Sequence, residues 1–212
     1  LEFRSVLLPI SSGLMLAAKT DEAGQALMAA LKEHAIDRRY LALVHGNFVK
    51  DTGLIDAPIA RSAADRKRMA VRDIPQAKEA LTTFTVLERL TLPADDLHFC
   101  LIECKLDTGR THQIRVHLEF ARHPLVGETV YRSGAPRTPQ ASLGLTHQFL
   151  HSYRLDFVHP ITGEALSFTD NLPDELEGAL SPLREHADVT AYGREVRERL
   201  VTAPHPRAME VS

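Results

Sequence analysis

The segment from Asp107 to His117 brings together residue types that bind anions or take part in catalysis. It contains two arginines, two histidines and a glutamine, directly after the triplet Asp107-Thr108-Gly109. Glycine tolerates the positive φ of tight turns, so the triplet predicts a reversal of the chain. Thr111 is a residue type that caps helices. Apolar residues follow it at helical spacing, at Ile114, Leu118 and Ala121.

Arg110 would lie just before the first turn of that helix, where its side chain can point into a cleft. A helix N-terminus also offers free backbone N–H groups to an anion. We therefore expect a site that binds a negatively charged group or pairs with a carboxylate.

The segments around this site are expected to form strands joined as hairpins. Residues 81–90 and 97–106 read as two strands connected by a turn, and residues 149–157 and 165–169 read as a second pair. Strands outnumber helices and most are linked as hairpins. This predicts the α+β class, with a mixed, largely antiparallel sheet and flanking helices.

Two further elements are predicted before these hairpins. Residues 13–18 and 40–44 are short apolar segments typical of strands. Thr20 can cap a helix in which Ala23, Leu27 and Leu31 share one face. Gln113 is expected to form hydrogen bonds within the fold.

Length and composition favour one globular domain. The chain has 212 residues and 44% hydrophobic content, so we expect a single domain over residues 1–212 with a flexible tail at 203–212. The net charge of −3 means that any binding of a polyanion must come from a local basic patch. A candidate patch is formed by Arg61, Arg66, Lys67, Arg68 and Arg72.

Cysteine usage and targeting signals point to the cytoplasm. Cys100 and Cys104 lie on one face of a predicted strand, which favours buried free thiols over a disulfide. Neither a signal peptide nor an apolar segment of membrane-spanning length is apparent, so we expect a cytoplasmic protein with no membrane contact.

Several motifs in order resemble the RluA-type pseudouridine synthases. Gly109-Arg-Thr-His-Gln-Ile-Arg-Val-His117 is similar to the third motif of that family, and Arg38-Arg-Tyr-Leu-Ala-Leu-Val-His-Gly46 is similar to the second. His123-Pro-Leu-Val-Gly-Glu-Thr-Val-Tyr131 follows at the family's usual distance. Further similar segments are Ser12–Thr20, Asp65–Val71, Leu150–Leu155 and His159–Glu164. The resemblance covers roughly residues 5–180 and implies a mixed sheet with a central RNA-binding cleft.

One position departs from the family pattern. The first family motif is His-Arg-Leu-Asp-x-x-Thr-Ser-Gly, in which the Asp is the nucleophile. Counting back from Ser12-Gly13 places Leu8 at that Asp, and the sequence has no acidic residue between Glu2 and Asp21. Residues 1–10 could be foreign, since the first five resemble the remnant of a cloning site, or altered near the motif. The third explanation is a genuinely inactive paralogue; we favour the first two because Tyr40 and Arg110 are intact.

The resemblance also implies roles for individual residues. Arg110 would pair with the nucleophilic carboxylate, and Tyr40 would stack on the uracil and help to remove its C5 proton. Leu125 would form an apolar floor under the base, although an ordinary core leucine looks the same in sequence. His112 and Arg115 would bind phosphate or brace the loop. Arg66 and Arg68 would contact RNA.

We therefore predict isomerisation of a uridine in structured rRNA or tRNA to pseudouridine, without a cofactor. The chain as written is expected to be inactive because of Leu8. The alternative is a non-catalytic RNA-binding or RNA-remodelling paralogue. A metal hydrolase is a third hypothesis, but the histidine pairs 112/117 and 147/151 lack carboxylate or thiolate companions at ligand spacing, so no metal is expected. The oligomeric state stays open.

Overall fold

The computed structural model describes residues 2–5 and 11–202, with residues 2–5 and 202 described by their backbone alone. Leu8 and the predicted tail at 203–212 lie outside the described residues. The missing nucleophile at position 8 and the flexible tail therefore stay predictions.

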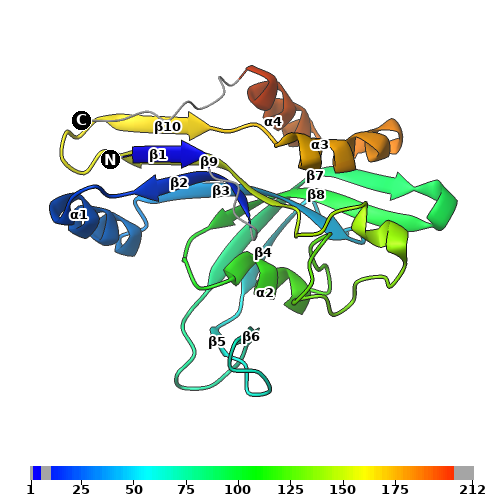
Figure 1. Ribbon diagram of the computed structural model, residues 1–212, viewed down its shortest axis with the longest axis horizontal. Helices are drawn as coiled ribbons and strands as arrows, with labels where there is room; N and C mark the ends of the chain where they lie inside the picture. Colours follow the sequence, from blue (N-terminus) through cyan, green and yellow to red (C-terminus); the bar gives the residue numbers. More distant parts are fainter. Residues whose placement is uncertain (1, 6–10, 203–212) are drawn as a thin grey trace.

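A nine-stranded sheet forms the centre of the described part of the chain (Figure 1). Its main path runs β1-β2-β9-β3-β8-β7-β11, while β10 pairs with β9 and β4 pairs with β7. The strands are β1 (Glu2–Ser5), β2 (Ser12–Ala17), β3 (Ile36–His45), β4 (Thr52–Asp56), β7 (Leu81–Leu92), β8 (Leu97–Leu106), β9 (Leu150–Val158), β10 (Ala165–Thr169) and β11 (Asp188–Val189).

The pairings confirm the predicted fold class. Among the described strands of this sheet, each pairing is antiparallel except that of β2 with β9, which is parallel at Ser12↔His151 and Gly13↔Ser152. Both predicted hairpins, β7–β8 and β9–β10, are present. Asp96 closes the first turn in the left-handed conformation, with a φ of 51°.

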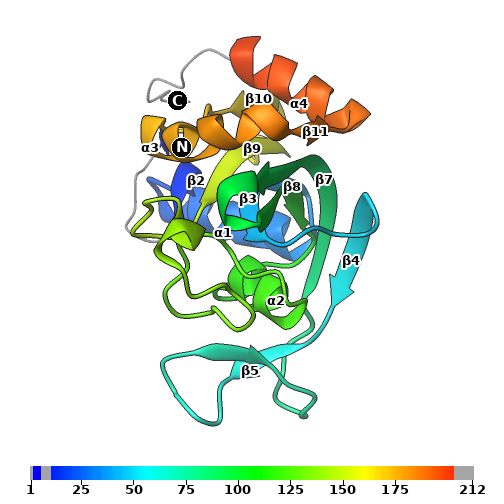
Figure 2. The same cartoon turned by 90° about the vertical axis from the view of Figure 1, so that its right-hand side faces the viewer.

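Helices cover both faces of the sheet (Figures 1 and 2). We call the face beneath α2 (Gln113–Phe120) the front, and the face beneath α3 (Asp174–Leu180) and α4 (Ala191–Thr202) the rear. Ile114 and Leu118 of α2 pack with Cys100 and Cys104 in the front core. Leu41 and Leu43 of β3 pack on the rear. Strand alternation thus supplies both cores from the same strands.

The first helix, α1 (Asp21–Lys32), begins as predicted. The Thr20 hydroxyl accepts a hydrogen bond from the Ala23 N–H at 3.2 Å, which caps the helix. Ala23 and Leu27 are buried, whereas Leu31 on the same face is 40% exposed. The cysteine prediction is also confirmed, because Cys100 and Cys104 are buried free thiols.

A separate two-stranded sheet extends beyond α2 on the front side. Its strands are β5 (Ile59–Arg61) and β6 (Met69–Val71), and both views show the hairpin lying away from the main sheet (Figures 1 and 2). Ile59 packs with Val116 of α2 and with Tyr131, which anchors the hairpin. Short 3₁₀ helices at Pro93–Asp95, Pro139–Ser142 and Ser181–His186 complete the described elements. Within residues 11–202, no helix combines the length and apolar character needed to cross a membrane.

Candidate functional site

The turn before α2 differs from the prediction in two respects. Thr111 does not cap the helix, because the N-cap position is occupied by His112, whose side chain makes no capping hydrogen bond. The left-handed residue is also His112, with a φ of 56°, and not Gly109. Gln113 supplies the physical reason: its side-chain Oε1 accepts hydrogen bonds from the Arg110 N–H at 2.9 Å and the Thr108 hydroxyl at 2.8 Å. The predicted internal role of Gln113 is confirmed.

Gly109 does not have a positive φ, but it lies close to the end of the Arg38 side chain. A Cβ atom at this position would lie 2.8 Å from Nη1 of Arg38, closer than real Cβ contacts. Any larger residue would displace the guanidinium of Arg38. The glycine therefore lets β3 and the loop before α2 place Arg38 beside Arg110.

Arg110 occupies the boundary between two pockets. Its Nε donates a hydrogen bond to the backbone oxygen of Glu79 at 2.8 Å, which fixes the side chain at the surface. One pocket, here called the hairpin pocket, lies between β5–β6 and Arg110. The other, here called the Arg38 pocket, lies between Arg110 and the C-terminal end of α1. Arg110 therefore lines both of these surface hollows.

The hairpin pocket has a volume of about 580 Å³ and carries positive charge. No carboxylate is among its lining residues, and its charged side chains are Arg61, Lys67, Arg72, Lys78 and Arg110. Arg61 and Arg72 donate to the backbone oxygens of Arg66 and Arg61. Carbonyl acceptors leave the guanidinium charge uncompensated, so the pocket can attract a polyanion.

Two residues of the predicted basic patch lie outside this pocket. Arg66 is exposed at the tip of the hairpin. Arg68 forms an ion pair with Glu119 at 3.6 Å and places its guanidinium carbon 5.1 Å from the centre of the Tyr131 ring. Arg68 thus connects the hairpin to α2, while Lys67 on the same loop lines the pocket.

Tyr40 and Leu125 lie on the front side of the sheet. Both belong to the front core, in which Leu125 is 1% exposed and forms an isolated bridge with Val44 of β3. Burial raises the pKa of Tyr40, although the positive charge of Arg38 and a hydrogen bond with Ser152 act in the opposite direction. The phenol is therefore protonated near neutral pH, and Arg38 is the nearby group that would stabilise a phenolate.

Arg115 and His112 hold the loop after α2. Arg115 forms a bidentate pair with Glu128, with distances of 2.6 and 2.8 Å, and their side chains are 7% and 0% exposed. Burial alone would raise the pKa of Glu128, but the hydrogen bonds from Arg115 lower it. His112 Nδ1 lies 2.9 Å from the Tyr131 hydroxyl. Of the two alternatives for Arg115, this geometry matches the bracing role.

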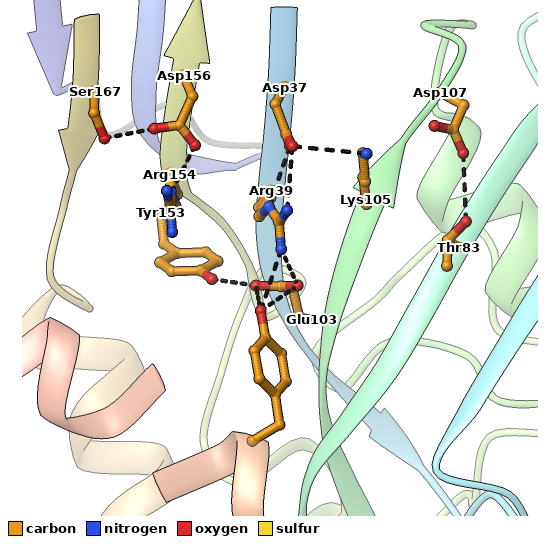
Figure 3. Close-up of polar contacts among 11 residues, drawn as sticks. Asp37, Arg39, Thr83, Glu103, Lys105, Asp107, Tyr153, Arg154, Asp156 and Ser167 are labelled. Carbon is orange, nitrogen blue, oxygen red and sulfur yellow. Dashed lines mark hydrogen bonds and ion pairs between the residues drawn. The ribbon is translucent and has the colours of Figure 1, made fainter. Parts of the chain in front are cut away.

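Arg39, the residue after Arg38, lies on the opposite, rear face of the sheet. Nη1 of Arg39 donates to Glu103 at 3.0 Å on the rear side, and Asp37 also pairs with Arg39 (Figure 3). Tyr153 and Tyr192 donate hydroxyl hydrogen bonds to the same Glu103. Because Tyr192 belongs to α4, this cluster ties the C-terminal helix to the sheet. Because side chains alternate along β3, Arg39 stabilises the rear face of the sheet and Arg38 lies at the candidate site on the front face.

The described residues contain no group of three histidine, cysteine or acidic side chains arranged to hold a metal ion. His117 is instead a core residue, with its ring nitrogens 2.9 Å from the Thr82 hydroxyl and 2.9 Å from the Ala57 oxygen.

The sequence analysis assigned no role to three cations that line the two pockets, namely Lys32, Arg38 and Lys78. Arg38 was part of a motif but received no role, although it lies two residues before Tyr40 and a strand places such residues on one face. Lys78 lines the hairpin pocket from the segment before β7, and no local pattern marks it.

Comparisons with known proteins identify the relatives of this chain. A family model described as RNA pseudouridylate synthase matches residues 10–120. Ribosomal large subunit pseudouridine synthase D of Nitrosomonas europaea is 41% identical over 184 residues, which cover 85% of this chain and 51% of that protein. An uncharacterized RNA pseudouridine synthase of Bacillus subtilis is 41% identical over 177 residues, which cover 83% of this chain and 54% of that protein.

A solved structure supports the fold. Human RNA pseudouridylate synthase domain containing 1 superposes with a TM-score of 0.70 at 24% identity, covering 97% of this chain and 82% of that one. The chain spans about half the length of the curated relatives named above. On the matched residues and the motifs around Tyr40 and Arg110, the chain belongs to the RNA pseudouridylate synthase family.

Proposed function

We propose that the site is built to isomerise uridine in structured RNA, with ribosomal RNA as the favoured substrate. The observation that carries the proposal is the position of Arg110, which lies between two pockets that are lined by arginines and lysines and by no carboxylate. The chain as a whole has a net charge of −3, so this concentration of cations is local. The name of the Nitrosomonas relative refers to the large ribosomal subunit and supports the choice of rRNA.

The reaction breaks the N1–C1′ bond of uridine and joins C1′ to C5. The enzyme must first lift the base from its stack, which costs a few kcal/mol and least for an unpaired nucleotide. Cationic pockets on both sides of Arg110 offset part of this cost by holding the backbone. Arg110 would keep a nucleophilic carboxylate ionised, and Tyr40 would stack on the base and help to remove the C5 proton.

Position 8 decides whether this chain completes the reaction. Leucine has no group that can attack a sugar or a base, so the chain carrying Leu8 is proposed to bind structured RNA without isomerising uridine. If leucine is the natural residue, the protein is a binding or remodelling paralogue that kept the site. If the natural residue is aspartate, it is an active enzyme.

Tritium release from RNA labelled at C5 of uridine tests the proposal. The chain with Leu8 should release no tritium above background, and Leu8→Asp should release it at an enzymatic rate. Release by the Leu8 chain would mean that another carboxylate serves. A Leu8→Asp variant that folds and binds RNA but releases nothing would refute the assignment of the site.

A further inference from the structure

The Arg38 pocket has the composition of an anion site. It has a volume of about 300 Å³, and its lining residues include no carboxylate. The lining comprises Leu31, Lys32, His34, Arg38 and the segment 108–110. Two arginines and a lysine thus face one small hollow.

Arg38 lies in this pocket without a compensating acid. Its Nε is buried and has no hydrogen-bond partner. Among the side chains that the structure describes, no carboxylate forms an ion pair with Arg38. A buried donor that stays unsatisfied costs free energy, so a ligand that accepts a hydrogen bond from this Nε would be stabilised.

The acidic groups at this end of the sheet are occupied elsewhere. Figure 3 shows that Asp37 pairs with Arg39 and Lys105 on the rear face, and that Asp107 accepts a hydrogen bond from Thr83. Arg39 is therefore neutralised, whereas Arg38 is not. The two adjacent arginines differ in surroundings because they point to opposite faces.

Glycine at position 109 leaves room for the end of the Arg38 side chain. A Cβ there would collide with the Arg38 guanidinium at 2.8 Å, so the glycine keeps the fork of Arg38 beside the Arg110 side chain. A guanidinium presents paired N–H donors that match phosphate oxygens, and Lys32 adds a second positive charge from the end of α1.

We propose that the Arg38 pocket binds a backbone phosphate of the substrate RNA, next to the nucleotide held at Arg110. This inference rests on the proposed function and extends it, because it predicts the course of the RNA strand across the protein surface. The strand passes from the hairpin pocket across Arg110 into the Arg38 pocket, and each pocket holds phosphate on its own side of the target nucleotide.

The test compares RNA binding by Arg38→Gln and Lys32→Gln with that of the unchanged chain. Lys50→Gln is the matched control, because Lys50 is an exposed cation outside both pockets. The probe is unmodified large-subunit ribosomal RNA at several salt concentrations. Loss of one phosphate contact should lower the slope of log K against log salt by about 0.7–0.9, and the control should retain the full slope. Equal slopes for all variants would overturn the proposal.

Phosphate ethylation interference on the same RNA locates the contact. The unchanged chain should show a set of phosphates whose ethylation weakens binding, and Arg38→Gln should lose one or two neighbouring members while the others remain. An identical set in both proteins would refute the site. If Arg38→Gln does not fold, Lys32→Gln carries the same test from an exposed helix end.

The outcomes separate this inference from the proposed function. A chain that fails to bind RNA at all, or a Leu8→Asp variant that releases no tritium, counts against the proposed function. RNA binding with an interference pattern that Arg38→Gln leaves unchanged counts against the Arg38 pocket alone.

Discussion

Replacement of Arg115 distinguishes a structural brace from a phosphate ligand. In Arg115→Met, the aliphatic stem is kept and the guanidinium is lost, so Glu128 stays buried without its bidentate partner. The pair is almost fully buried, with exposures of 7% and 0%. Removing one partner from such a pair typically destabilises a protein by about 3–5 kcal/mol, because an uncompensated charge remains inside.

That loss is large compared with the total stability of a domain, about 5–15 kcal/mol. With a denaturant slope of about 2–3 kcal/mol per molar urea, the unfolding midpoint should fall by roughly 1–2.5 M. Addition of Glu128→Leu to Arg115→Met should recover part of the loss, since neither charge then remains buried.

Urea unfolding followed by circular dichroism measures the effect. Arg137→Met is the control, because Arg137 is exposed and its replacement should change stability by no more than about 0.5 kcal/mol. Arg115→Met should also leave the salt dependence of RNA binding unchanged. A stability loss below about 1 kcal/mol, together with a reduced salt slope, would refute the bracing role and favour phosphate binding.

Three further properties follow from the structure. Burial lowers the pKa of His45 to about 4, so the free energy of unfolding should fall by up to about 3 kcal/mol as the pH decreases from 6.5 to 4. Urea midpoints measured across this pH range should show the fall, and His45→Gln should reduce it. Gly13→Ala should lower the unfolding midpoint, because Gly13 has a φ of 105° and a Cβ would lie 2.2 Å from the Ser152 oxygen, whereas Gly144→Ala adds strain without a clash. Burial raises the pKa of Cys100 to about 11, so a thiol reagent at pH 8 should modify neither cysteine in the native protein and both in urea; fast native modification would contradict this.

Local patterns were sufficient for much of the fold. Both hairpins and α1 follow from alternation, turn residues and the Thr20 cap, all of which act over a few residues. The order of strands in the sheet did not follow, because the parallel pairing of β2 with β9 joins segments about 140 residues apart and leaves no local trace.

The start of α2 shows why even a local prediction can fail. Thr111 and Gly109 have the residue types of a cap and a turn, yet neither takes that role. Gln113 is held by the Leu81 oxygen and the Thr82 hydroxyl of β7, and this tertiary position lets its side chain cap the turn. The partners that hold Gln113 belong to β7, about 30 residues earlier in the chain, so the sequence around α2 does not reveal them.

The sequence by itself determined the family resemblance and the fold class, and it predicts roles for Tyr40 and Arg110, because these depend on motifs and on short-range periodicity. Only the tertiary structure separated Arg38 from Arg39. Their side chains are alike and adjacent, but one meets Glu103 on the rear face and the other meets an open pocket on the front. The charge that remains available for a ligand depends on which carboxylates the fold brings near, and only the folded chain decides that.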